Sequence, residues 1–199
     1  MKLDDLSALL STTLEKPISY FNELKRTLRQ QSADLARLDS KLDAETLEHR
    51  EASPAQIDFR GRPGPGGGVN VDPSLAAFFM LAAVLNAPRA QTSHETHTVW
   101  HFTTLAGSLD ELDFNPCFLT RTHLFGETLQ AIVSDPTLAK RVRQIQISVR
   151  GNWAQIHYDD DRVSRFARRQ ERQSFFSEIL VLDGAIVQAV AAFLAKAHP

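Results

Sequence analysis

Residues 143–159 read RQIQISVRGNWAQIHYD, and this stretch decides the fold class. Apolar residues such as Ile145 and Ile147 alternate with polar ones, which is the period of a strand with one buried face. Gly151-Asn152 then predicts a tight turn, and WAQIHYD continues the alternation on the way back. The stretch therefore predicts an antiparallel hairpin. Because helical patterns surround it, the chain is expected to be an α+β protein.

The chain after the hairpin predicts one more strand and a closing helix. A polar run, DDDRVSRFARRQERQ, fills residues 159–173, and SFFSEILVL at 174–182 predicts the third strand of a small antiparallel sheet. GAIVQAVAAFLAKA at 184–197 is apolar enough to predict a helix that covers this sheet.

The chain before the hairpin predicts helices. Asp72-Pro73 marks a helix start, with Asp as the N-cap and Pro at the first helical position. The helix that follows, roughly 73–86, is apolar almost all round and should be buried in a core. The other expected segments are a helix within 92–104, an extended PCFLTR at 116–121, and helices over 123–135 and 136–142.

A stretch rich in glycine and proline divides the chain. Residues 60–70 contain five glycines and two prolines, so they predict a boundary near residue 65. We therefore predict a helical domain over residues 1–53, a linker over 54–71, and an α+β domain over 72–199.

Three helical patterns fill the predicted N-terminal domain. Residues 3–13 place leucines on one stripe, Lys16-Pro17 breaks the chain, and Ser19 can cap a second helix over 19–31. A third pattern runs through residues 32–51.

Two short helices joined by a break have the layout of a helix-turn-helix, in which 19–31 would be the recognition helix. Asn and Gln can pair with adenine edges, Arg with guanine, and Lys with phosphate. The residues expected to face outward, toward DNA, are Tyr20, Asn22, Glu23, Lys25, Arg26, Arg29 and Gln30.

A coiled coil fits the same residues. Seven positions recur with alternating spacings of three and four, which is the seam of a coiled coil with one polar position, and they are Phe21, Leu24, Leu28, Gln31, Leu35, Leu38 and Leu42. This interpretation makes 19–46 one long helix, whereas a helix-turn-helix requires a break near Gln31-Ser32. Both remain open at the level of sequence.

The linker contains Arg60-Gly61-Arg62-Pro63, which is similar to the core of the AT-hook. That resemblance implies that Arg60 and Arg62 enter a narrow A·T minor groove, where negative potential is concentrated. A plain linker is the other interpretation, because the flanks lack the further Lys and Arg residues that AT-hooks carry.

The chain also resembles a group of uncharacterised proteins of bacterial prophages and mobile elements. The resemblance rests on GRPGPGGGVNVDPSLAAFFMLAAVL, FGETLQAIVSDP, RVRQIQISVRGNWAQIHY and the closing AVAAFLA. It implies a short helix-turn-helix-like segment ahead of a basic linker, DNA-linked regulation of a phage or mobile element, and no known catalytic residues.

Three of the seven histidines, His94, His97 and His101, fall in SHETHTVWH. Spacings of three and four place them on one face of a helix, which would suit a metal held by three imidazoles. The order H-E-x-H lacks the spacing of zinc proteases, and no other cluster offers a fourth ligand. We interpret them as solvated residues of a polar helix face and predict no metal site.

Three further features predict structure rather than chemistry. Cys117 has apolar neighbours and no adjacent base, so a buried structural thiol is expected. The acidic triplet 159–161 lacks calcium-loop spacing and predicts a solvated loop. GPGGG at 64–68 lacks the Gly-Lys-Ser/Thr of a phosphate-binding loop. We therefore predict no enzyme activity, no cofactor and no small-molecule substrate.

Composition limits the partners. The net charge is −2, but residues 136–199 carry ten Lys and Arg against six Asp and Glu. The longest apolar run, 75–85, has eleven residues where about 20 are needed to cross a membrane. With one cysteine and no signal-peptide pattern, a cytoplasmic location is expected. The combined expectation is a homodimeric transcription regulator that binds double-stranded DNA, or else an adaptor or assembly factor that oligomerises through its N-terminal helices.

Overall fold

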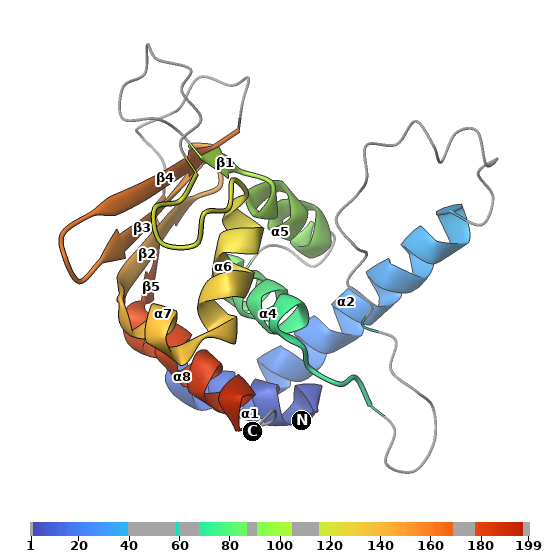
Figure 1. The fold of residues 1–199 in the computed structure, drawn as a ribbon. Coiled ribbons are helices and arrows are strands. Elements are labelled where there is room, and N and C mark those ends of the chain that lie inside the picture. The colour runs from blue at the N-terminus through green and yellow to red at the C-terminus, as the bar shows by residue number, and fades with distance from the viewer. Residues whose placement is uncertain are drawn as a thin grey trace.

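The computed structural model of the chain describes residues 2–39, 59, 68–86, 91–104, 116–168 and 178–196. Within these ranges the protein has seven helices and one five-stranded antiparallel sheet, which is the α+β class predicted from the hairpin (Figure 1).

The helices are α1 (Leu3–Thr13), α2 (Ile18–Asp39), α4 (Pro73–Leu85), α5 (Thr92–Trp100), α6 (Phe125–Ser134), α7 (Pro136–Lys140) and α8 (Gly184–Ala195). The strands are β1 (Thr103–Thr104), β2 (Val142–Ser148), β3 (Trp153–Tyr158), β4 (Val163–Ala167) and β5 (Leu180–Asp183). The α1, α4, α5, α6 and α7 helices and the closing α8 helix all fall where the sequence predicts them.

The predicted hairpin lies at the centre of the sheet, whose strand order is β1-β4-β3-β2-β5. Ile145 of β2 faces Ile156 of β3, and Asn152 in the turn between them adopts a left-handed φ of 54°. β5 pairs with the other side of β2, where Leu182 lies opposite Ile145. The described part of the predicted third strand is therefore confirmed.

Strand β4 corrects the prediction for the polar run 159–173. It pairs antiparallel with β3, and it buries Ser164 and Phe166 while Arg165 between them is exposed. Buried and exposed residues do alternate along β4. The charged residues around them obscure this pattern in the sequence. PCFLTR also differs from the prediction, because residues 118–120 form a turn rather than an extended segment.

Helices cover one face of the sheet (Figure 1). α7 and α8 contact β2, and α4 and α8 contact β5. On the far side of the hairpin, Phe125 of α6 meets Phe166 of β4 with 5.3 Å between ring centroids. The inward residues of β2, β4 and β5 therefore face helices, and Tyr158 of β3 packs against Phe118 of the turn before α6.

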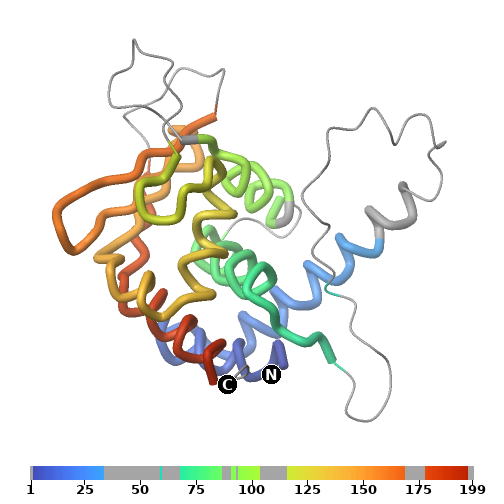
Figure 2. The backbone as a smooth tube through the Cα atoms, viewed as in Figure 1, coloured from blue at the N-terminus to red at the C-terminus, as the bar shows by residue number. Residues whose placement is uncertain are grey.

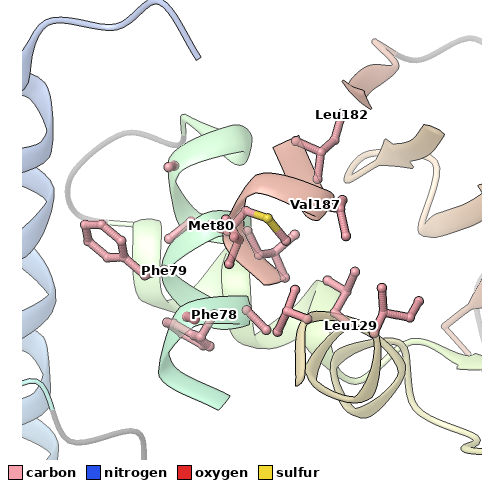
Figure 3. Close-up of a cluster of buried hydrophobic side chains, with 14 of the residues drawn as sticks. Phe78, Phe79, Met80, Leu129, Leu182 and Val187 are labelled. Atoms are coloured by element: carbon pink, nitrogen blue, oxygen red, sulfur yellow. The ribbon is translucent and has the colours of Figure 1, made fainter. Parts of the chain in front are cut away.

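Helix α4 lies inside this core. Asp72 caps it by accepting a hydrogen bond from the Leu75 amide at 2.8 Å, as the Asp-Pro start predicts. Side chains all round the helix are buried, since α4 packs against α2, α5, α6 and β5. Figure 3 shows members of this cluster, namely Phe78, Phe79, Met80, Leu129, Leu182 and Val187.

The N-terminal helices bury their apolar residues in the same core. Leu6 and Leu10 of α1 and Phe21 of α2 are fully buried. α1 packs against α8, so the first and last helices lie side by side and the two chain ends are close together (Figure 2). Most of the predicted linker 54–71 lies outside the described residues, so the three-part division stays a prediction.

Among the described helices, none is both long enough and apolar enough to cross a membrane.

Candidate interaction site on the N-terminal helices

The turn between α1 and α2 is fixed to the end of α4. Lys16 Nζ donates a hydrogen bond to the Ala83 carbonyl at 2.8 Å, and the Tyr20 hydroxyl donates to the same oxygen at 3.1 Å. The ammonium also lies 4.3 Å from the centroid of the Tyr20 ring. Carbonyls in the last turn of a helix lack partners within the helix, so these two donors satisfy one of them. Tyr20 is therefore half-buried and hydrogen-bonded to α4.

A second contact joins α2 to α1. Lys25 Nζ lies 2.5 Å from Asp4 Oδ1, and the lysine side chain is only 10% exposed. The hydrogen bond from Lys25 holds the pKa of Asp4 below its usual value. Lys25 was predicted to face outward toward phosphate, and this prediction is wrong. Its aliphatic stem packs at the α1–α2 contact and its charge is neutralised there.

Four of the other predicted α2 residues are exposed, and Glu23 is half-buried. Asn22, Arg26, Arg29 and Gln30 are all on the solvent side of the helix. Arg26 forms an ion pair with Glu23 one turn earlier, and Arg29 Nε donates to the Phe59 carbonyl at 3.2 Å. Arg60 and Arg62, the residues of the AT-hook resemblance, lie outside the described residues.

Helix α2 runs without a break through Gln31-Ser32 and ends at Asp39. The predicted break between a second and a third helix is wrong, because residues 18–39 contain no glycine or proline and Ser32 continues the helix instead of capping a new one. The interpretation as one long helix is therefore confirmed within the described residues.

The two halves of α2 have different surroundings. The first half buries Phe21, Leu24 and Leu28 in the core. Figure 1 shows that the C-terminal part of α2 extends away from the packed helices. The predicted seam positions Leu35 and Leu38 fall in this second half of the helix.

The three histidines of α5 do not share one environment. His94 and His101 are exposed, but His97 is half-buried and its ring lies 4.9 Å from that of Phe78. Burial lowers the pKa of His97, and neighbouring His101 and His94 lower it further. The prediction of a solvated face is therefore wrong for His97. Within the described ranges, no three His, Cys, Asp or Glu side chains are placed to hold a metal ion.

Cys117 is a buried free thiol, as predicted. Its Sγ lies 3.3 Å from the Tyr158 hydroxyl and accepts a hydrogen bond from Ser164 Oγ at 3.4 Å. Burial raises the pKa of this thiol, but hydrogen bonds from Ser164, Thr120 and Tyr158 outweigh it and lower the pKa overall. Sequence reasoning missed these partners because two of them come from strands far along the chain.

The acidic triplet is solvated, as predicted, and it is paired with arginines. All three aspartates are exposed. Arg141 reaches Asp159 at 3.0 Å and Asp160 at 2.6 Å, and Arg162 also binds Asp160. These ion pairs hold the β3–β4 turn against the end of α7.

Comparison of the chain with protein-family models, with curated proteins and with solved structures gives no match in any of the three. The resemblance to prophage and mobile-element proteins therefore stays a prediction. The function has to be inferred from the surfaces of the protein.

Proposed function

We propose that the protein is a non-enzymatic interaction protein, an adaptor or assembly factor, that self-associates through the second half of α2. The observation that carries this proposal is the unbroken helix beyond Leu28, which leaves the core while the apolar 3,4 spacing of the sequence continues.

A second copy of the chain is the partner that this helix fits. The positions that continue the seam are Gln31, Leu35 and Leu38, and an apolar stripe is self-complementary when two copies meet about a two-fold axis. Association through so short a seam is expected to be reversible and dependent on concentration.

Sedimentation velocity at several protein concentrations tests this proposal. We expect reversible dimers of the unaltered chain. The double variant Leu35→Glu/Leu38→Glu should raise the dissociation constant roughly 100-fold or more, because a carboxylate buried without a partner costs several kcal/mol. Ala36→Glu adds a charge in the same turn away from the seam, and it should still dimerise. A chain that is monomeric at every concentration, or a double variant that associates like the unaltered chain, would show that the proposal is wrong.

Binding of double-stranded DNA is a second candidate, because Asn22, Arg26, Arg29 and Gln30 are exposed along α2. A duplex bound through about four phosphate contacts should lose roughly 100-fold in affinity when salt rises fourfold. Arg26→Ala should weaken that binding, and it leaves the Arg29 hydrogen bond to Phe59 intact. Absence of duplex binding at low salt would exclude this candidate and, with it, the predicted role in transcription of a phage or mobile element.

We also propose a cytoplasmic location. The support is the free thiol of Cys117, which fits a reducing compartment.

A further inference from the structure

The sheet has a second face on which no described helix packs (Figure 1). Its residues alternate with the buried ones along each strand. They are Gln144 and Gln146 on β2, Trp153, Gln155 and His157 on β3, Val163 and Arg165 on β4, and Val181 on β5. We call this set the open face. It is independent of the α2 surface described above.

The strand pairing arranges the open face in rows across the sheet. Gln155 lies in register with Gln146 on one side and Arg165 on the other. Trp153 lies between two small residues, Ser148 and Ala167, so no long side chain of a neighbouring strand stands directly beside the indole.

The length of β3 gives this face room for several nucleotides. Trp153 and His157 are four residues apart on the strand, about 13 Å at ~3.3 Å per residue. An aromatic ring at one end, an imidazole at the other and amides between them therefore follow one line.

The polar groups on this line are not engaged elsewhere. Within the described residues, no hydrogen bond is made by the side chains of Gln144, Gln146 or Gln155, and Arg165 has no carboxylate partner. His157 Nε2 is a buried polar atom without a hydrogen-bond partner in the same part of the chain. A ligand that offers both donors and acceptors would satisfy the glutamine amides and Arg165, whereas the buried His157 Nε2 is out of its reach.

Three exposed arginines, Arg143, Arg150 and Arg165, lie on or beside this face, and Arg143 is paired with Asp161 at 3.6 Å. Arg143 lies at the end of the sheet next to His157, and Arg150 is exposed in the turn next to Trp153. Burial lowers the pKa of His157, and the charges of Arg143 and Arg165 lower it further. The carboxylate at the β5 edge, Asp183, is occupied as the N-cap of α8.

These features point to a ligand with phosphates, flat rings and hydrogen-bonding edges on one strand. Single-stranded nucleic acid has all three exposed, whereas a duplex hides its base faces inside the stack. Arginines bind phosphates, aromatic side chains stack on bases whatever their sequence, and glutamine amides pair with base edges. We propose that the open face binds single-stranded nucleic acid, with Trp153 stacking on a base and with Arg143 and Arg165 holding the backbone.

Fluorescence anisotropy with the full chain tests this proposal. The probes are fluorescein-labelled oligo(dT) and oligo(U) of about twelve nucleotides, and the duplex of the same length, at about 50 and about 200 mM salt. We expect binding of one or both single strands, weaker binding of the duplex, and loss of affinity as salt rises.

Variants of the open face locate the binding. Arg165→Ala should weaken binding roughly tenfold and make it less dependent on salt, since one phosphate contact is lost. Gln155→Glu changes little in shape and should weaken binding by repelling phosphate. Trp153→Ala should cost roughly 5- to 150-fold, the range of one base stack, whereas Trp153→Phe keeps a ring and should recover most of it.

Lys140→Ala is the matched control, because it removes an exposed cation from α7, away from the open face, and should leave single-strand binding unchanged. Circular dichroism confirms that each variant is folded. The proposal is wrong if the unaltered chain binds neither single strand at low salt, or if folded Arg165→Ala and Gln155→Glu bind like the unaltered chain. It is also wrong if duplex binds as tightly as single strand and Arg26→Ala is the variant that loses it, since that result would place binding on α2.

Discussion

At the scale of single residues, two glycines allow close approaches that any side chain would prevent. A Cβ on Gly126 of α6 would lie 2.0 Å from the Trp100 ring of α5. A Cβ on Gly184, at the start of α8, would lie 2.1 Å from the Val142 carbonyl oxygen. The lack of a side chain therefore sets how closely α6 packs on α5 and how closely α8 approaches β2.

Gly126→Ala should destabilise the protein, although alanine is usually the better residue in a helix. The Trp100 ring would have to move, and overpacking of this kind costs about 1–3 kcal/mol. Urea denaturation followed by tryptophan fluorescence measures the change. Glu127→Ala, at the exposed position beside it, should have little effect. Unchanged or higher stability of Gly126→Ala would show that the contact can relax freely.

The buried histidine should make stability depend on pH. The pKa of His97 is lowered in the folded state, chiefly by burial. The unfolded chain therefore binds more protons below about pH 6.5, and stability is lost as the pH falls through the folded pKa. Each such group changes the free energy of unfolding by at most about 1.4 kcal/mol per pH unit.

Thermal denaturation between about pH 7.5 and 5 tests this dependence of stability on pH. His101 and His157 should contribute to it in the same direction, because burial lowers their pKa values too. His97→Gln should flatten the curve. A melting temperature of the unaltered chain that is the same across this range would contradict the prediction.

At the scale of elements, the turn between α1 and α2 stabilises the end of α4. Lys16→Met keeps most of the aliphatic stem but removes the cation from the Ala83 carbonyl. We expect a loss of about 1–2 kcal/mol, from one charged hydrogen bond at a helix C-terminus. Chemical denaturation compares it with Lys140→Met, an exposed lysine of α7. Equal stability of the two variants would mean that Tyr20 alone satisfies this carbonyl.

The elements that local periodicity defines could be predicted from the sequence, and those that depend on pairing could not. The hairpin, α4 and α8 carry clear patterns of their own. β4 is recognisable only through its pairing with β3, because Arg165 and its charged neighbours dominate the local composition. The two-residue β1 has too few residues for any periodicity.

The same distinction applies to the candidate site. Asn22 and Arg26 were expected outside from the helical period alone, and they are exposed. The helical period also predicts that Lys25 faces outward, but Lys25 is ion-paired with Asp4 of α1. The residues next to Lys25 in the sequence give no sign of that ion pair. Continuity of α2 at Ser32 was also undecided in the sequence, because serine both caps helices and continues them.

At the scale of the whole molecule, the described residues share one core that includes α1. Leu6→Ala should therefore cost about 2–5 kcal/mol, the range for a buried leucine. The loss should appear equally in far-UV circular dichroism and in the fluorescence of Trp100 and Trp153, which lie in α5 and β3. Ala8→Ser, on the exposed side of the same helix, is the control. A fluorescence transition that Leu6→Ala leaves in place would show instead that residues 1–53 unfold as a separate domain.

The packing of α1 against α8 has a consequence for synthesis in the cell. The ribosome makes α1 well before α8, so α1 has its neighbour α2 early but lacks its contact with α8 until that helix has been synthesised. α4, apolar on every side, emerges before α6 and β5 are available to cover it. Until they follow, the nascent chain exposes the apolar sides of α4, which is the kind of surface that aggregates or binds chaperones.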